Sequence, residues 1–160
     1  VLRTIRNNRL FIRFMAKIAL NNRPPLSLLK RFIVEKSGEH KNKIDLKMRG
    51  LTPVVDAARV LSLDLGIKTQ NTFERLSAIN RKGVIDDSFH ADLQEAYEFI
   101  VYLQISRHLD ALAKGGEPNN FLDPASLNSL QRKMLKESFA VVRRLQETIE
   151  YRFQTKVIEV

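Results

Sequence analysis

Apolar residues recur at steps of three and four along most of the chain, which is the spacing that places them on one face of an α-helix. Capping residues mark where these segments start and stop. Thr52-Pro53 opens one helix that Gly66 ends, and Asp86 opens another that Gly115 ends. The pattern predicts five helices, over residues 1–21, 52–65, 71–83, 86–115 and 123–153.

The first of these helices has two distinct faces. One face is apolar and the other is basic; the two sets are Phe11, Phe14, Met15 and Ile18, and Arg6, Arg9, Arg13 and Lys17. We expect the phenylalanines to lie in the core. A basic stripe is compatible with binding to a phosphate backbone, but a solvated face or a contact with an acidic neighbouring domain is the more common explanation.

The helix that begins at Asp86 carries apolar residues on two sides. One stripe consists of Phe89, Leu93, Ala96, Ile100 and Leu103, and the other of Tyr97, Val101, Ile105 and Leu112. A helix that is apolar on two sides is typical of the centre of a bundle. We therefore expect this helix to be the central one.

Two short segments between residues 29 and 49 lack helical spacing. Residues 29–36 are rich in β-branched and aromatic side chains, and in residues 44–49 Ile44, Leu46 and Met48 alternate with charged residues. A polar turn at residues 37–40 separates them, which predicts a β-hairpin. The expected fold is mainly α: an antiparallel bundle of about five helices with a small β-hairpin inserted after the first helix.

Length and composition narrow the class of protein. With 160 residues the chain is long enough for a single helical domain, residues 1–160. Because it begins with Val1, we expect a C-terminal fragment of a larger multidomain protein. The absence of cysteine excludes disulfides and thiolate metal sites. No apolar run has the length of a membrane span or the form of a signal peptide, so we expect a cytoplasmic protein with no membrane partner.

The balance of charge favours anionic partners. Lys and Arg number 27 against 18 Asp and Glu, a formal net charge of +9. Nucleotides, nucleic acid and an acidic protein surface all fit such a surplus.

No catalytic or metal-binding motif is recognisable. The three histidines, His40, His90 and His108, are far apart and lack metal-ligand spacing with any acidic residue. The adjacent acids Asp86 and Asp87 are explained by the preference for negative charge at a helix N-terminus. The sequence therefore predicts no catalytic residue and no metal site.

Residues 44–59 concentrate charge beside a predicted helix start. Free backbone amides and the positive end of the helix dipole would favour an anionic group there. The candidate substrate-binding residues are Asp45, Lys47, Arg49, Gly50, Asp56 and Arg59. An alternative is that Asp56 and Arg59 form a surface ion pair at i, i+3 spacing and that Asp45 supports Lys47.

The same stretch carries a family resemblance. The run IDLKMRGLTPVVDAARVL at residues 44–61, with NTFERLSAI, EPNNFLDPASL and LKESFAVVRRLQETIEYRF, resembles the putative nucleotidyltransferase substrate-binding domain. That domain is found at the C-terminus of bacterial CBS-domain signalling proteins, and the likeness covers nearly the whole chain. The family's patterned positions are occupied here by Asp45, Lys47, Gly50, Pro53, Asp56 and Arg59. His108 stands where the family often has Gln.

The resemblance implies an accessory role in a larger protein. Family members carry cyclic-nucleotide-binding and CBS modules upstream, then a nucleotidyltransferase domain similar to that of the PII-protein uridylyltransferase. The catalytic Gly-Ser…Asp-x-Asp signature belongs to that domain and is absent from residues 1–160. The resemblance thus implies a nucleoside triphosphate and Mg²⁺ in the catalytic domain, and no cofactor in this chain.

The leading hypothesis is a chain that is not an enzyme by itself. It would be the substrate-binding module of a nucleotidyltransferase-type signal-transduction protein, holding a nucleotide or an acidic acceptor protein beside the catalytic domain. Lys47 and Arg59 would face the anionic group with help from Arg49, Asp45 and Asp56 would orient these cations, and Gly50 would allow close approach. One alternative is a docking or dimerisation module in which the motif is a structural corner. The other is a basic nucleic-acid-binding bundle.

Overall fold

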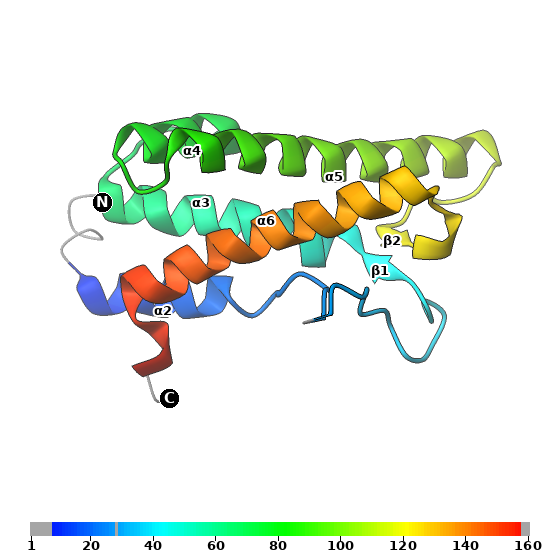
Figure 1. The fold of residues 1–160 in the computed structure, drawn as a ribbon, viewed down its shortest axis with the longest axis horizontal. Coiled ribbons are helices and arrows are strands. Elements are labelled where there is room, and N and C mark those ends of the chain that lie inside the picture. The colour runs from blue at the N-terminus through cyan, green and yellow to red at the C-terminus, as the bar shows by residue number, and fades with distance from the viewer. Residues whose placement is uncertain (1–7, 28, 158–160) are drawn as a thin grey trace.

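The computed structural model describes residues 8–27 and 29–157. Within them lie five α-helices: α2 Arg9–Ala19, α3 Thr52–Leu65, α4 Thr72–Arg81, α5 Asp87–Ala113 and α6 Ser129–Phe153. The shorter elements are strands β1 Ile44–Asp45 and β2 Phe121–Leu122, a π-helix Lys47–Leu51, and 3-10 turns Pro124–Ser126 and Thr155–Val157 (Figure 1). The predicted mainly α fold of about five helices with a small antiparallel β element is confirmed. None of the described helices has the length and apolarity needed to cross a membrane.

Most predicted helix ends are confirmed by the capping geometry. Gly66 ends α3 with a left-handed backbone (φ 69°), and the side chains of Asn71 and Asp86 cap the first turns of α4 and α5. The start of α6 was predicted wrongly. Asp123 caps only the short 3-10 turn, and Asn128 caps α6 through a capping box with Gln131.

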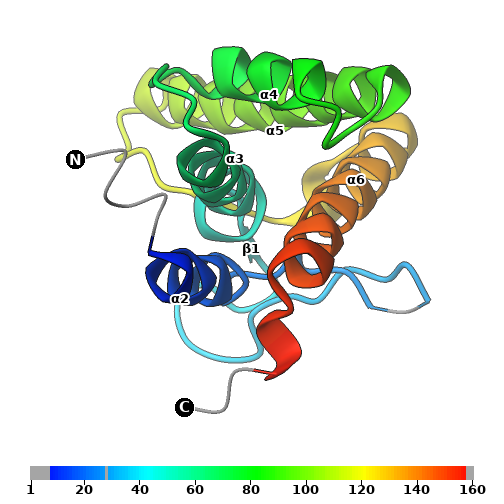
Figure 2. The ribbon, with the colours of Figure 1, turned by 90° about the vertical axis from the view of Figure 1, so that its left-hand side faces the viewer.

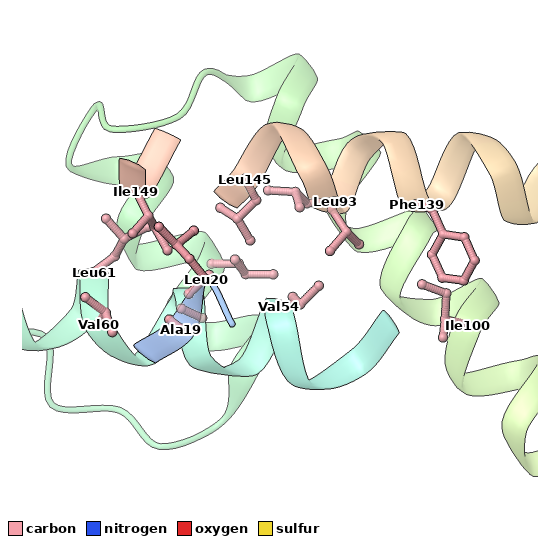
Figure 3. Close-up of a cluster of buried hydrophobic side chains, with 14 of the residues drawn as sticks. Ala19, Leu20, Val54, Val60, Leu61, Leu93, Ile100, Phe139, Leu145 and Ile149 are labelled. Carbon is pink, nitrogen blue, oxygen red and sulfur yellow. The ribbon is translucent and has the colours of Figure 1, made fainter. Parts of the chain in front are cut away.

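The centre of the bundle is α3, not α5. Seen along the bundle, α3 has α2 below it, α4 and α5 above it and α6 to its right (Figure 2). Val54 and Leu61 of α3 and Leu145 of α6 belong to one buried cluster in the core (Figure 3). Only the first predicted stripe of α5 is buried. The second stripe reaches the surface, where Ile105 is 52% and Leu112 59% exposed, so the expected central place of this helix was wrong.

The predicted hairpin partner was also wrong. Strand β1 pairs antiparallel with β2, Ile44 opposite Leu122 and Asp45 opposite Phe121, rather than with residues 29–36. In that segment the only β-type pairing within the described residues is an isolated bridge between Leu26 and Phe32. The alternation in residues 44–49 resembles a strand, but the backbone turns helical at Leu46 (φ −63°, ψ −36°). Strand β1 is therefore only two residues long.

Helix α2 buries a different face from the one expected. Its buried residues are the small or branched Ile12, Ala16 and Ala19. The predicted core phenylalanines, Phe11 and Phe14, are 41% and 38% exposed. Two alanines allow α2 to approach α3 closely, which leaves the larger apolar side chains outside. Residues 1–7, including Arg6 of the predicted basic face, lie outside the described residues.

Helices α2 and α6 cap each other's C-terminal ends. Arg13 of α2 donates from Nε to the carbonyl of Phe153 (3.1 Å) and from Nη2 to that of Gln154 (3.3 Å). Gln146 of α6, which is buried, donates from Nε2 to the carbonyls of Ala19 (3.1 Å) and Asn22 (2.9 Å). These bonds satisfy carbonyls that a helix end leaves unpaired. Arg13 of the basic face is thus engaged in holding the fold.

Gly50 packs closely against α5 and α6. A Cβ atom added there would be 3.0 Å from Cγ2 of Ile100 and 3.3 Å from Cε1 of Phe139. Both neighbours are fully buried, and Cγ2 of Ile100 is attached directly to its stiff, β-branched Cβ. Neither can move aside without disturbing the core.

We expect Gly50→Ala to lower the free energy of unfolding by about 1–3 kcal/mol, because overpacking outweighs the helix propensity gained by alanine. Urea denaturation measures this change. Gly116→Ala is the matched control, since its nearest contact would be the Ala111 carbonyl at an ordinary 3.5 Å. Equal stability of Gly50→Ala and the unmodified chain would contradict the close approach.

Candidate functional site

The motif segment forms one continuous helical run that starts earlier than predicted. Asp45 Oδ1 accepts a hydrogen bond from the backbone amide of Met48 (2.9 Å), the bond that an N-cap residue makes to the third helical residue. The run then passes through the wide π-turn into α3, and the amide of Thr52 donates to the carbonyl of Lys47. The predicted N-cap at Thr52 was therefore wrong. The Thr52 amide is already paired within the helix and is not free for an anion.

A groove of about 550 Å³ opens between this helical run and α5. Three of the six candidate residues line it: Lys47, Asp56 and Arg59. Asp45, Arg49 and Gly50 do not. Asp45 serves as the cap, and Gly50 is buried against the core rather than open to a ligand. The remaining lining residues are Leu51, Thr52, Val55, Tyr97, Gln104, His108 and Asn120.

Positive charge dominates the α3 wall of the groove. Asp56 and Arg59 form the ion pair that their spacing suggested, with Oδ1 2.8 Å from Nη1. The pair is partly exposed, so it contributes only a few tenths of a kcal/mol, about 0.3–0.5. Burial, with the nearby positive charge of Arg59, lowers the pKa of the Arg75 guanidinium. Lys47 and Arg59 thus line this wall of the groove with the single carboxylate of Asp56.

The α5 wall supplies an aromatic ring and polar groups. Tyr97 is half-buried and meets the ring of Phe73 edge-on, with centroids 5.3 Å apart. Gln104 donates from Nε2 to Oδ1 of Asn120 (2.6 Å). Nε2 of His108 lies 3.1 Å from the carbonyl of Asn119. The last two contacts fix the segment that leads into β2 against α5.

Sequence reasoning missed the α5 half of the groove. Tyr97, Gln104 and His108 are separated by seven and four residues, so they share one helical face. Tyr97 had been placed in the second apolar stripe. The signal that identifies this face is that the stripe becomes polar at Gln104 and His108, where an entirely buried stripe would stay apolar.

The cap at Asp45 gives a prediction about stability alone. Asp45→Ala removes the acceptor of the Met48 amide and should cost about 0.5–2 kcal/mol of unfolding free energy. Asp45→Asn keeps a capping oxygen and should cost much less. Thermal denaturation of both variants at one pH measures the difference. Equal losses would mean that the carboxylate charge, and not the cap, is what matters.

Among the described residues, no group of three or more His, Asp or Glu is placed to hold a metal ion.

Comparison with known proteins identifies the family. No curated protein and no solved structure matches the chain. A protein-family model described as a putative nucleotidyltransferase substrate binding domain matches residues 9–153, which span α2 to α6 and include the whole motif segment. The chain therefore belongs to the putative nucleotidyltransferase substrate-binding domain family.

Proposed function

We propose that the groove between α3 and α5 binds the phosphate groups of a nucleotide, which the chain presents to a nucleotidyltransferase domain. The observation that carries this proposal is the meeting of Lys47 and Arg59 with Tyr97 and His108 in one groove. Cations beside a half-buried aromatic ring match a molecule that has a phosphate at one end and a flat base at the other.

The two cations suit different parts of a phosphate chain. Lys47 is exposed at the mouth of the groove and acts as a point charge that follows a mobile phosphate. Arg59 is held by Asp56 through a single nitrogen. Its guanidinium therefore keeps further N–H donors for the two-point contact that phosphate oxygens accept. The adjacent charge of Arg75 strengthens the positive potential without lining the groove.

The α5 wall is suited to the nucleoside part. Tyr97, held edge-on by Phe73, offers a supported ring on which a base stacks. The Gln104–Asn120 pair leaves one amide oxygen and one amide NH₂ for the edge of that base. On this proposal the chain binds and orients, while the transferring groups, Mg²⁺ and the reacting triphosphate belong to a catalytic domain.

The test is a calorimetric titration of the chain with ATP and with UTP. Lys47→Gln and Arg59→Gln should each weaken binding at least about tenfold, since hydrogen bonds to charged groups contribute about 1.5–3 kcal/mol. Arg49→Gln removes the same charge from the same motif outside the groove, and it should have little effect. Binding should also weaken as salt is added.

Equal loss in all three variants would show that net charge, not the groove, determines the affinity. Absence of binding to either nucleotide would contradict the nucleotide proposal. An acidic acceptor peptide that bound instead, and lost affinity in Lys47→Gln and Arg59→Gln but not in Arg49→Gln, would assign the groove to the other substrate class.

A second candidate role is docking to the catalytic domain through α2. Four large apolar side chains on this helix are exposed: Leu10, Phe11, Phe14 and Ile18. A stripe of this kind marks an interaction surface. The same helix carries basic residues, so we propose that its occupant is an acidic, partly apolar face of the nucleotidyltransferase domain.

Hydrogen exchange measures this contact directly. The amides of α2 should exchange more slowly in a polypeptide that includes the nucleotidyltransferase domain than in this chain alone, which should run as a monomer on gel filtration. Phe14→Asp should abolish the difference, whereas Met134→Asp, an exposed apolar residue on α6, should keep it. A dimer of the chain alone that Phe14→Asp dissociates would assign the stripe to a second copy.

A further inference from the structure

A second cleft lies at the far end of α5, at the right of Figure 1 where α5 ends and α6 begins. Its volume is about 390 Å³, within the range of small-molecule sites. The C-terminal turns of α5 form one wall, and β2, the 3-10 turn after it and the first turn of α6 form the other. Leu103, Leu122 and Leu127 make a buried apolar floor.

Arg107 is the unusual residue of this cleft. Its Nε atom is inaccessible to solvent and has no hydrogen-bond partner. No ion pair is formed by this side chain among the described residues, although Asp110 lines the same cleft. A buried donor without a partner is unfavourable, and more so when the group is charged. Such a donor requires an explanation, so the chemistry of the groups around it matters.

The groups around Arg107 match an oxyanion. Lys114 adds a second cation against the single carboxylate of Asp110, and the Ser106 hydroxyl adds a donor. Gln131 accepts from the Asn128 amide through Oε1, which leaves its NH₂ group as a donor. The 25-residue helix α6 also begins here, and its positive dipole end adds to the field of Arg107.

We infer that this cleft is a second binding site, which takes the phosphate or carboxylate group of a small molecule in contact with Arg107. The apolar part of that molecule would lie on the leucine floor. The site is separate from the groove between α3 and α5. Both sites are bordered by α5 and by the segment that leads into β2, but they have no lining residue in common. Asn120 lines the groove, and Leu122 lines the cleft. The inference does not depend on nucleotide binding by the groove.

The test is an NMR titration of the ¹⁵N-labelled chain with inorganic phosphate, and separately with acetate, at constant ionic strength. We expect saturable shifts of the Arg107 Nε–H and of the Ser106 and Ser126 amides. Saturation by phosphate alone identifies a phosphorylated ligand, and saturation by acetate alone identifies a carboxylate.

Matched variants locate the binding. Arg107→Gln should weaken it at least about tenfold, the factor that 1.4 kcal/mol represents. Arg81→Gln, an exposed arginine on α4, should leave it unchanged, and Lys47→Gln should do so too. Shifts that do not saturate with either anion, or that persist in Arg107→Gln, would overturn the inference. If that variant does not fold, the Arg107 Nε–H shift in the unmodified chain decides the question.

Discussion

The close contact of Gly50 with Ile100 and Phe139 is the constraint on which the rest of the structure depends. Without a Cβ at this position, the helical run that begins after Asp45 lies directly against α5 and α6. The π-turn widens the helix at the same place, which turns Lys47 and Leu51 outward while Gly50 faces inward. The groove lies beside this contact, between the outward-facing residues of the helical run and α5.

The second organising feature is that polar side chains hold the ends of chain segments in place. Gln104 and His108 hold residues 119 and 120 against α5, and the amide of Leu46 donates to the carbonyl of Asn120 (2.9 Å). The short pairing of β1 with β2 is stable because these bonds place its partner. An isolated two-residue ladder would not persist in water. The same bonds that complete the fold thus form one wall of the groove.

Local signals in the sequence were sufficient to predict the ends of most helices, but they were insufficient to predict contacts between distant segments. Asn71, Asp86 and Gly66 act on their own helix, so their positions identify the helix ends. The partner of β1 lies far along the chain, and nothing in residues 29–49 indicates it. For α2, periodicity gave one apolar face that included Phe11 and Phe14, whereas the face that is actually buried depends on how closely Ala16 and Ala19 allow α3 to approach. That is a property of the pair of helices.

The candidate site shows the same contrast, between what local sequence signals predict and what packing decides, within a single motif. The six residues selected by charge and spacing point in different directions once the chain is helical, because successive residues point about 100° apart. Lys47, Asp56 and Arg59 point into the groove, Asp45 caps the helix, and Gly50 faces the core. A single sequence motif contains groove-lining, capping and packing residues together, because a residue can bind a ligand only if the helix that carries it starts and packs correctly. The motif therefore describes a supported surface: Lys47, Asp56 and Arg59 line the groove, and Asp45 and Gly50 hold the helical run that carries them in place.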